Sequence, residues 1–248
     1  MKTNAYTHRF YRKISVPEDL YRCEFKEKES DLFISSGKQV KSSALKVLKK
    51  YRKQIEKYME KDPKFKSALT PYRLPKNAPL IVRKMQEAGK ACNVGPMATV
   101  AGAISQFLGK ELLKLTDEII IENGGDIFIK TKKPRKVAIF SGDTAWKDKL
   151  ILIIKPQNFP LGICTSSGKL GRSLSLGKAD TATIIADSAI LADAVATAVG
   201  NMIQSARDIP KAIRYCKKIK GLKGVVIVKD SNLGIWGDIQ LQDTNGNR

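Results

Sequence analysis

The chain has 248 residues, of which 42% are hydrophobic and 28% are charged, and its formal net charge is +21 at pH 7. This apolar fraction supplies a core, so global disorder is excluded. The first residues are polar and basic, and the apolar runs are too short or too interrupted to be a signal peptide or to span a bilayer. We therefore expect a cytoplasmic protein without a membrane anchor.

The excess positive charge raises nucleic acid as a partner, because Lys and Arg neutralise phosphates. However, the Lys residues are mixed with 24 acidic residues, and aromatic residues make up only 7% of the chain. Few side chains are thus available to stack on bases, and Lys-rich surfaces are also common in proteins from hot environments. Nucleic-acid binding is therefore not expected as the main function.

The first half of the chain predicts strands followed by helices. Residues 6–34 alternate apolar and charged positions, as in YRCEF, and predict an antiparallel opening. Residues 38–61 carry apolar side chains three to four apart, which predicts a long amphipathic helix with a Lys-rich outer face. That face is interpreted as solvated, with docking of an anionic partner as the alternative. Residues 70–79 are Pro-rich and predict an internal loop, and a helix is expected over 95–115.

The second half predicts the core of a sheet. Four segments rich in branched residues follow one another between residues 117 and 166. A strand over 181–186 leads into a helix over 188–204, and a shorter helix spans 210–218. A closing hairpin is expected with Ser231 and Asn232 in its turn.

These elements predict a single α/β (α+β) domain over residues 1–248. In this fold two layers are expected, with helices covering a mixed, largely antiparallel sheet. Residues 242–248 are polar and are expected to form a disordered tail.

The first concentration of polar residues is Glu122-Asn123-Gly124-Gly125-Asp126, between two apolar runs. Paired glycines allow positive φ and the close approach of a ligand, while Asn123 and Asp126 offer polar contacts. Taken alone, the segment favours a plain hairpin turn.

The second concentration follows the apolar run LGIC. Consecutive hydroxyls, glycines and two cations suit phosphate oxygens, which backbone N–H groups and charge-assisted bonds can hold. The spacing of a Walker loop is absent, and a Ser-rich surface loop is an equal alternative. The residues concerned are Thr165, Ser166, Ser167, Gly168, Lys169 and Arg172.

The third is Asp193 and Thr197, which are four residues apart and so share one face of the predicted helix, among alanines. A carboxylate and a hydroxyl suit a hard cation such as Mg²⁺, which takes its remaining ligands from water and phosphate. The alternative is a pair of buried hydrogen-bonding groups. The cleft expected for a ligand lies between this helix and the two loops described above.

In the order NGGD, TSSG and ADAVATA, these segments resemble the ApbE-like family, whose best-known members are Mg²⁺-dependent flavin transferases. The resemblance covers roughly residues 90–201 and is closest to a poorly characterised prokaryotic branch marked by VGPMATVAGAI, ENGGDIF, GICTSSGKLG and ADAVATAVGN. It implies an ApbE-like fold that binds FAD, FMN or a related nucleotide with Mg²⁺. It also implies transfer of FMN from FAD to a protein Ser or Thr, or hydrolysis of the pyrophosphate.

By position, the resemblance assigns Asp193 and Thr197 as Mg²⁺ ligands, with a backbone carbonyl near Met97 or Ala98 as a third. It places the flavin nucleotide against the two polar loops. These are residues 123–126 and 165–168, with Lys169 and Arg172 beside the second.

One family segment is missing. Flavin transferases carry His-Ile-x-Asp-Pro-x-x-Gly after the TSG loop, where this chain reads SLSLGKADTATIIAD. The only histidine is His8, which is interpreted as structural or exposed. Asp180 or Asp187 would replace a histidine base only if the fold directs one of them inward.

Two alternatives come from other classes of function. Four cysteines form no C-x-x-C pair, so neither a zinc site nor a disulfide framework is expected. Cys92 and Cys164 flank segments proposed to line the pocket, and a thiolate there would act as a nucleophile or sulfur carrier. The alternative is a buried thiol that packs as a small apolar residue at a strand end. The branch implied by the resemblance is linked to anaerobic sulfide assimilation into homocysteine with an iron–sulfur partner protein.

The last alternative is a scaffold that binds a phosphorylated ligand without catalysis. The missing histidine favours it, and the Asp193 and Thr197 pair argues against it. A homodimer is the default expectation for the oligomeric state.

Overall fold

The computed structural model describes residues 12, 17–142, 144–147, 149–168 and 177–243. His8, Lys169 and Arg172 lie outside the described residues. None of the helices that are described combines the length and the apolar character needed to cross a membrane.

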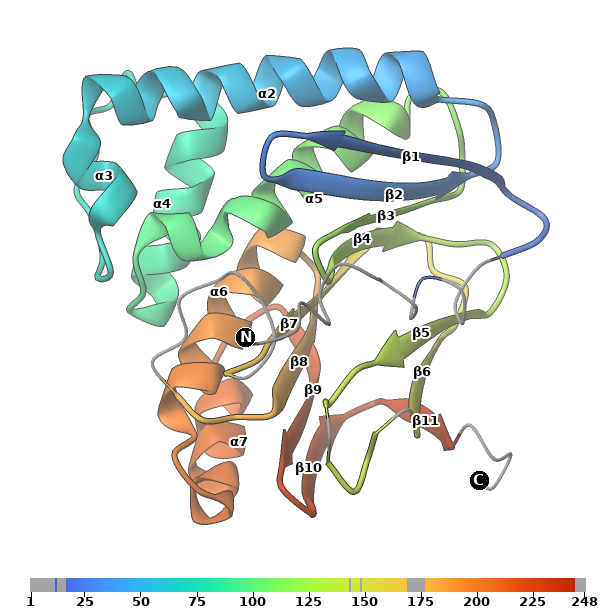
Figure 1. The fold of residues 1–248 in the computed structure, drawn as a ribbon, viewed down its shortest axis with the longest axis vertical. Coiled ribbons are helices and arrows are strands. Elements are labelled where there is room, and N and C mark those ends of the chain that lie inside the picture. The colour runs from blue at the N-terminus through green and yellow to red at the C-terminus, as the bar shows by residue number, and fades with distance from the viewer. Residues whose placement is uncertain (1–11, 13–16, 143, 148, 169–176, 244–248) are drawn as a thin grey trace, which may run out of the picture.

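A hairpin and a long helix come first, as predicted. β1 (Tyr21–Glu27) pairs antiparallel with β2 (Ser30–Ser36), and α2 (Lys41–Lys61) runs along the upper edge of the molecule in Figure 1. The buried residues of α2 recur every three to four positions, so one face packs inward while exposed lysines line the other. The buried residues are Ala44, Leu48, Tyr51, Ile55 and Tyr58.

Two helices absent from the predicted elements follow. α3 (Pro63–Ser67) and α4 (Leu80–Cys92) flank residues 70–79, which form neither helix nor strand. α4 begins directly after Pro79 and has no capping side chain, so the usual signal for a helix start is missing. The helix expected over 95–115 is present as a 3₁₀ turn, η1 (Pro96–Thr99), continued by α5 (Val100–Leu112).

The main sheet has eight strands in the order β1-β2-β3-β4-β7-β8-β9-β10. Every pairing between the described strands is antiparallel, so the largely antiparallel sheet is confirmed. Its remaining strands are β3 (Ile119–Asn123), β4 (Asp126–Lys130), β7 (Leu161–Ser166), β8 (Thr181–Ala186), β9 (Leu222–Lys229) and β10 (Asn232–Gly237).

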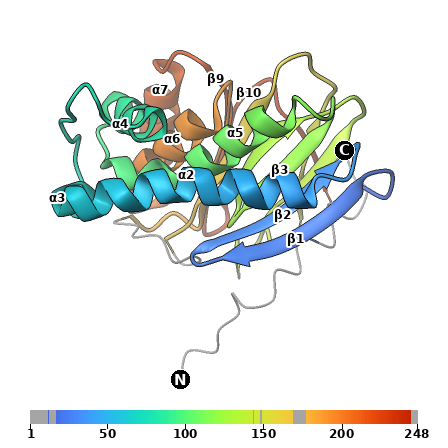
Figure 2. The same ribbon diagram turned by 90° about the horizontal axis from the view of Figure 1, so that it is seen from above.

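Helices cover one face of this sheet. α5 packs on β3 and β4, α6 (Ala189–Met202) packs on β7 and β8, and α7 (Ile209–Lys217) packs on β9 and β10. α2 lies against α5 on the outside of this layer, as the turned view in Figure 2 shows. The predicted covering of the sheet by helices is therefore confirmed.

A three-stranded sheet in the order β11-β6-β5 adds a layer that the prediction of two layers did not include. It consists of β5 (Arg135–Ile139), β6 (Leu150–Ile154) and β11 (Gln240–Asp243). The main sheet has a first core on the face that the helices cover and a second core on the face that the small sheet covers. Strand alternation explains this, because neighbouring side chains point to opposite faces. On β7, Ile163 faces the small sheet and Cys164 faces the helices.

Two expectations at the C-terminus need correction. The predicted disorder is wrong for Gln242 and Asp243, because they pair with Ile151 and Leu150 of β6. Residues 244–248 lie outside the described residues. In the last hairpin, Asp230 and Ser231 form the turn and Asn232 already belongs to β10. Asp230 adopts a φ of 57°, which the buried Asp180 stabilises by accepting its N–H.

Gly162→Ala tests how closely α6 lies on β7. A Cβ at position 162 would overlap backbone atoms of Ala189, whereas a Cβ at Gly37 would meet only the Thr116 hydroxyl at 3.1 Å. We expect Gly162→Ala to lower the free energy of unfolding by about 3 kcal/mol, measured by urea denaturation. The control Gly37→Ala should change it by less than about 1 kcal/mol. Equal effects of the two variants would contradict this packing.

Candidate functional site

The candidate site is built where α5 and η1 lie against α6. Gly102 makes the close approach possible, because a Cβ there would overlap the Ala189 carbonyl oxygen and lie 2.8 Å from the Asp193 Cβ. Alanine fills much of the facing surface of α6. Polar groups of the two helices therefore meet directly instead of through long side chains.

Asp193 and Thr197 both face this contact. The Asp193 Oδ2 accepts a hydrogen bond from the Gly102 N–H at 2.9 Å, and the Thr197 Oγ1 lies 3.5 Å from the Ala98 carbonyl oxygen, to which it donates. Gly102 is the third residue of α5, where N–H groups have no acceptor within the helix. Two predicted cation ligands and the carbonyl proposed as a third are thus gathered at one place.

The NGGD segment forms the turn between β3 and β4. Gly124 and Gly125 have φ values of 70° and 105°, which is why glycine is needed at both positions. The Asn123 Nδ2 donates to the Ala101 carbonyl oxygen at 3.3 Å, so this turn is held against the first turn of α5. The turn ends at Asp126, the first residue of β4.

Glu122, supported by Arg12, also stabilises this turn. The Glu122 Oε1 accepts from the Gly125 N–H at 2.8 Å, and its Oε2 accepts from the Arg12 Nε at 2.6 Å. Arg12 is itself buried and also pairs with Glu24 and Asp31. A buried charged group needs a partner, and the pairing of Arg12 with Glu122 satisfies both beside the site.

The TSSG segment ends β7 next to this turn. The Thr165 N–H bonds to Asp126, and the Thr165 hydroxyl lies 2.9 Å from that of Thr183 on β8. Ser166 is the last residue of the strand, and the Gly168 N–H donates to the Ala179 carbonyl oxygen at 2.8 Å. A Cβ on Gly168 would lie 2.6 Å from the Gly177 carbonyl oxygen, so this part of the loop is closely packed. Ser167 is partly exposed.

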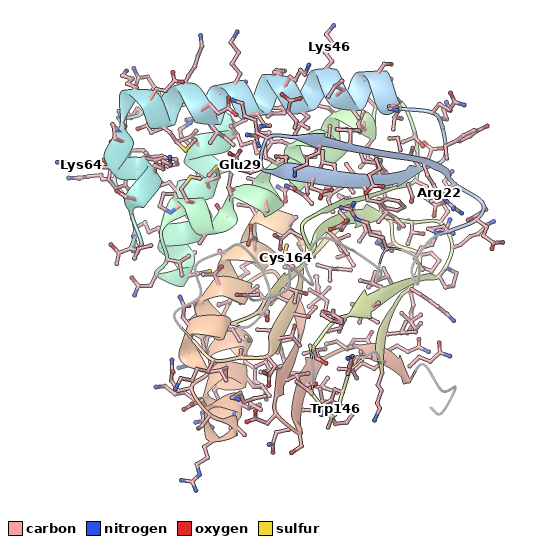
Figure 3. All side chains as sticks on the ribbon, in the orientation of Figure 1. Arg22, Glu29, Lys46, Lys64, Trp146 and Cys164 are labelled. Atoms are coloured by element: carbon pink, nitrogen blue, oxygen red, sulfur yellow. The ribbon has the colours of Figure 1, made fainter. Side chains whose placement is uncertain are left out.

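Asp126, Cys164 and Asp193 form an electrostatic cluster near the middle of the molecule, where Figure 3 labels Cys164. Burial, with the charge of Glu122, raises the pKa of Asp126 to about 7, although bonds from Cys164 and Thr165 lower it. Burial and the charge of Asp126 raise the pKa of Asp193 well above its usual range. Two carboxylates that resist ionisation together are suited to a cation that neutralises both.

The two candidate thiols are not activated. Burial, followed by the charges of Asp126 and Asp193, raises the pKa of Cys164 well above that of a free thiol. Its Sγ donates to the Ala189 carbonyl oxygen at 3.3 Å. Burial also raises the pKa of Cys92 to about 11. Since the thiolate is the nucleophile, this environment opposes the sulfur-carrier alternative.

The two candidate bases occupy different surroundings. The Asp180 Oδ2 accepts the Asp230 N–H and lies 3.9 Å from the Lys229 Nζ, so Asp180 has a structural role in the β9–β10 turn. Asp187 is exposed and pairs with Lys223 at 3.0 Å. A catalytic role for Asp180 stays a prediction.

The residues present fit a hard cation. Within the residues described, no three His, Cys, Asp or Glu side chains are arranged to hold a metal ion. A cation here would therefore need Asp193 together with the Thr197 hydroxyl and the Ala98 carbonyl oxygen. Such an all-oxygen donor set, completed by water and phosphate, is what Mg²⁺ uses.

Sequence reasoning missed two groups that shape this site, Arg12 and Gln106. Arg12 is 110 residues from Glu122, and Gln106 is 83 residues from Ala189, whose N–H it accepts. Gln106 falls on the face of α5 that also carries Gly102, and this four-residue spacing was the available signal.

Comparison with known proteins supplies relatives over most of the chain. The family model described as AbpE bacteria matches residues 12–230. The UPF0280 protein of Methanosarcina acetivorans is 37% identical over 199 residues, which are 79% of this chain and 78% of that protein. The UPF0280 protein of Methanocaldococcus jannaschii is 37% identical over 198 residues, or 78% of this chain and 80% of that protein.

Solved structures show the same fold. The apo form of the flavinyl transferase ApbE of Pseudomonas stutzeri matches with a TM-score of 0.57 at 11% identity, covering 88% of this chain and 93% of that chain. The ApbE protein of Thermotoga maritima matches with a TM-score of 0.53 at 15% identity, covering 88% and 96%. The predicted ApbE-like fold is therefore confirmed.

Asp126→Asn tests the buried carboxylate cluster in protein freed of cations by EDTA. The folded-state pKa of Asp126 is raised from 3.8 to about 7, so the folded protein holds a proton that the unfolded chain releases. Stability should fall as pH rises from about 4 to about 7 and stay low above that range. We expect Asp126→Asn to reduce this fall and to raise the melting temperature at pH 8 by roughly 3 °C.

The control is Asp187→Asn, which removes an exposed carboxylate from the start of the loop leading into α6. It should leave the pH dependence of melting unchanged. If Asp126→Asn melts like the wild type at every pH, ionisation of Asp126 does not destabilise the folded protein, and the expectation is contradicted.

Proposed function

The chain belongs to the family described as AbpE bacteria, and from this premise we propose that it binds a flavin nucleotide together with Mg²⁺. The ApbE-like fold supports a flavin-related function. The observation that carries the proposal is the meeting of Asp193, Thr197 and the Ala98 carbonyl oxygen at the α5–α6 contact. The NGGD turn and Thr165 lie next to these groups, because Asp126 of the turn bonds to the Thr165 N–H and interacts with Asp193.

Each part of the site has a separate task in this proposal. Asp193 and Thr197 would hold the cation, with Ala98 as the backbone ligand. When bound, Mg²⁺ would offset negative charge on the phosphoryl oxygens of the nucleotide. Gly124 and Gly125 leave open space, since a Cβ at either position would meet no atom within 4 Å. A nucleotide can therefore approach the turn closely.

Asp126 would act as the link between the cation ligands and the nucleotide loops. It accepts a hydrogen bond from the Thr165 N–H, interacts with the Cys164 side chain, and its charge interacts with that of Asp193. A cation beside Asp193 would stabilise the ionised forms of both carboxylates and so remove the cost of burying them. Binding of a cation and a nucleotide should therefore be coupled.

Transfer of FMN to a protein hydroxyl, or hydrolysis of the pyrophosphate, is the reaction this site would perform if it is catalytic. The segment that carries the histidine in flavin transferases is replaced by SLSLGKADTATIIAD. Such a reaction would then need a base other than histidine. The proposal rests on binding and does not require the transfer step.

Calorimetric titration with FAD, with and without Mg²⁺, tests the proposal. We expect binding that depends on Mg²⁺ in the wild type and a loss of affinity of at least about tenfold in Asp193→Ala and Thr197→Val. Asp187→Ala is the matched control, because it removes a carboxylate six residues away that is exposed and paired with Lys223. It should bind like the wild type.

Other results would assign the site differently. Binding of FAD that is equal without Mg²⁺ and in Asp193→Ala would indicate a scaffold without a functional cation site. No heat of binding under any condition would contradict the flavin proposal altogether.

A further inference from the structure

Three hydrogen-bonded pairs join α5 and η1 to α6, and together they form what we call the three-rung ladder. The pairs are Gln106 with Ala189, Gly102 with Asp193, and Ala98 with Thr197. Successive rungs are four residues apart on each helix, and they run in opposite directions along the chain. Four residues are about one helical turn, so all three rungs lie along one line of contact.

Gln106 makes the end rung, which contains neither of the proposed cation ligands. Its side chain is buried, and its Oε1 accepts from the Ser188 hydroxyl and the Ala189 N–H, each at 2.8 Å, and from the Ile190 N–H at 3.4 Å. The first N–H groups of a helix have no acceptor within it. A side chain of α5 therefore supplies the acceptor at the start of α6.

This rung sets the position of the other two. The Ala189 and Ile190 N–H groups can both reach the Gln106 Oε1 only when the first turn of α6 lies opposite Gln106. Moving α6 by one residue would shift it by about 1.5 Å and turn it by about 100°. Asp193 would then point away from Gly102, and Thr197 from Ala98.

We propose that Gln106 is a positioning residue that fixes the register of α6 against α5, and so holds Asp193 and Thr197 where they meet Gly102 and Ala98. The consequence of this register for cation binding rests on the proposed function. The register itself is a property of this chain alone and can be measured without any ligand.

A simple cap would have a narrower effect. A residue that only satisfies the N-terminus of α6 would change the stability of the protein when replaced, and nothing else. A positioning residue also changes the geometry one turn away. The distinction therefore needs a variant that lowers stability elsewhere to a similar degree.

The experiment compares three variants with the wild type. Gln106→Met keeps the length of the side chain and removes the acceptor oxygen, whereas Gln106→Glu keeps that oxygen. Val137→Ala lowers stability in the second core, on the opposite face of the sheet from α6. The two readouts are the affinity for Mn²⁺ alone, from the electron paramagnetic resonance signal of the free ion, and the amide exchange rate of Gly102, from NMR.

We expect Gln106→Met to weaken Mn²⁺ binding at least about tenfold and to speed exchange of the Gly102 amide by a similar factor. Gln106→Glu should stay within about threefold of the wild type for both quantities, since a carboxylate is well accepted at a helix N-terminus. Val137→Ala should melt earlier and leave both quantities unchanged.

Two results would overturn the inference. In one, the Gly102 amide of Gln106→Met exchanges like that of the wild type; in the other, Val137→Ala changes both readouts as much as Gln106→Met does. A wild-type protein that fails to bind Mn²⁺ would instead contradict the cation site of the proposed function. In that case the exchange rate of Gly102 still decides the role of Gln106.

Discussion

The backbone of α5 lies against α6 at Gly102, and the candidate site depends on that approach. Because Gly102 has no Cβ, its N–H reaches the Asp193 carboxylate at 2.9 Å without an intervening side chain. The N-terminal end of α5 carries a partial positive charge, which partly offsets the cost of burying Asp193. Gly162 likewise allows a close backbone approach, where β7 packs against the first turn of α6. Two glycines thus place an acidic side chain inside a layer of small apolar residues.

The acidic side chains of the candidate site lower the stability of the protein in the absence of a ligand. Half-buried Asp126 interacts electrostatically with buried Asp193, and desolvation raises the pKa of both. A fold optimised for stability alone would replace one of them with an apolar or neutral residue. Arg12 relieves part of the cost by pairing with Glu122 at 2.6 Å. The remaining negative potential is what a cation and a phosphorylated ligand would use.

Local patterns in the sequence predicted much of this structure. Asp193 and Thr197 share a helical face because they are four residues apart, and the paired glycines after Asn123 do form the turn between two strands. Contacts between distant segments were not predictable in this way. Nothing in the residues around Gln106 shows that its partner is the start of another helix, 83 residues later.

The layer formed by β5, β6 and β11 was missed for a similar reason. β11 is four residues long and joins the small sheet by pairing with β6, far away in the sequence. A short polar segment such as β11 is predicted to be disordered when its pairing with a distant strand is not known. Conversely, the missing family histidine was evident from sequence alone, and the structure adds that the thiols of Cys92 and Cys164 do not take its place as activated groups.

We propose that Asp193, Thr197 and the Ala98 carbonyl oxygen bind a divalent cation where α5 meets α6. Diffraction from crystals grown with Mn²⁺, collected at the manganese absorption edge, tests it most directly because the anomalous signal locates the ion. We expect one strong peak within bonding distance of Asp193 and Thr197. A peak held by other residues, or none at saturating Mn²⁺, would contradict it.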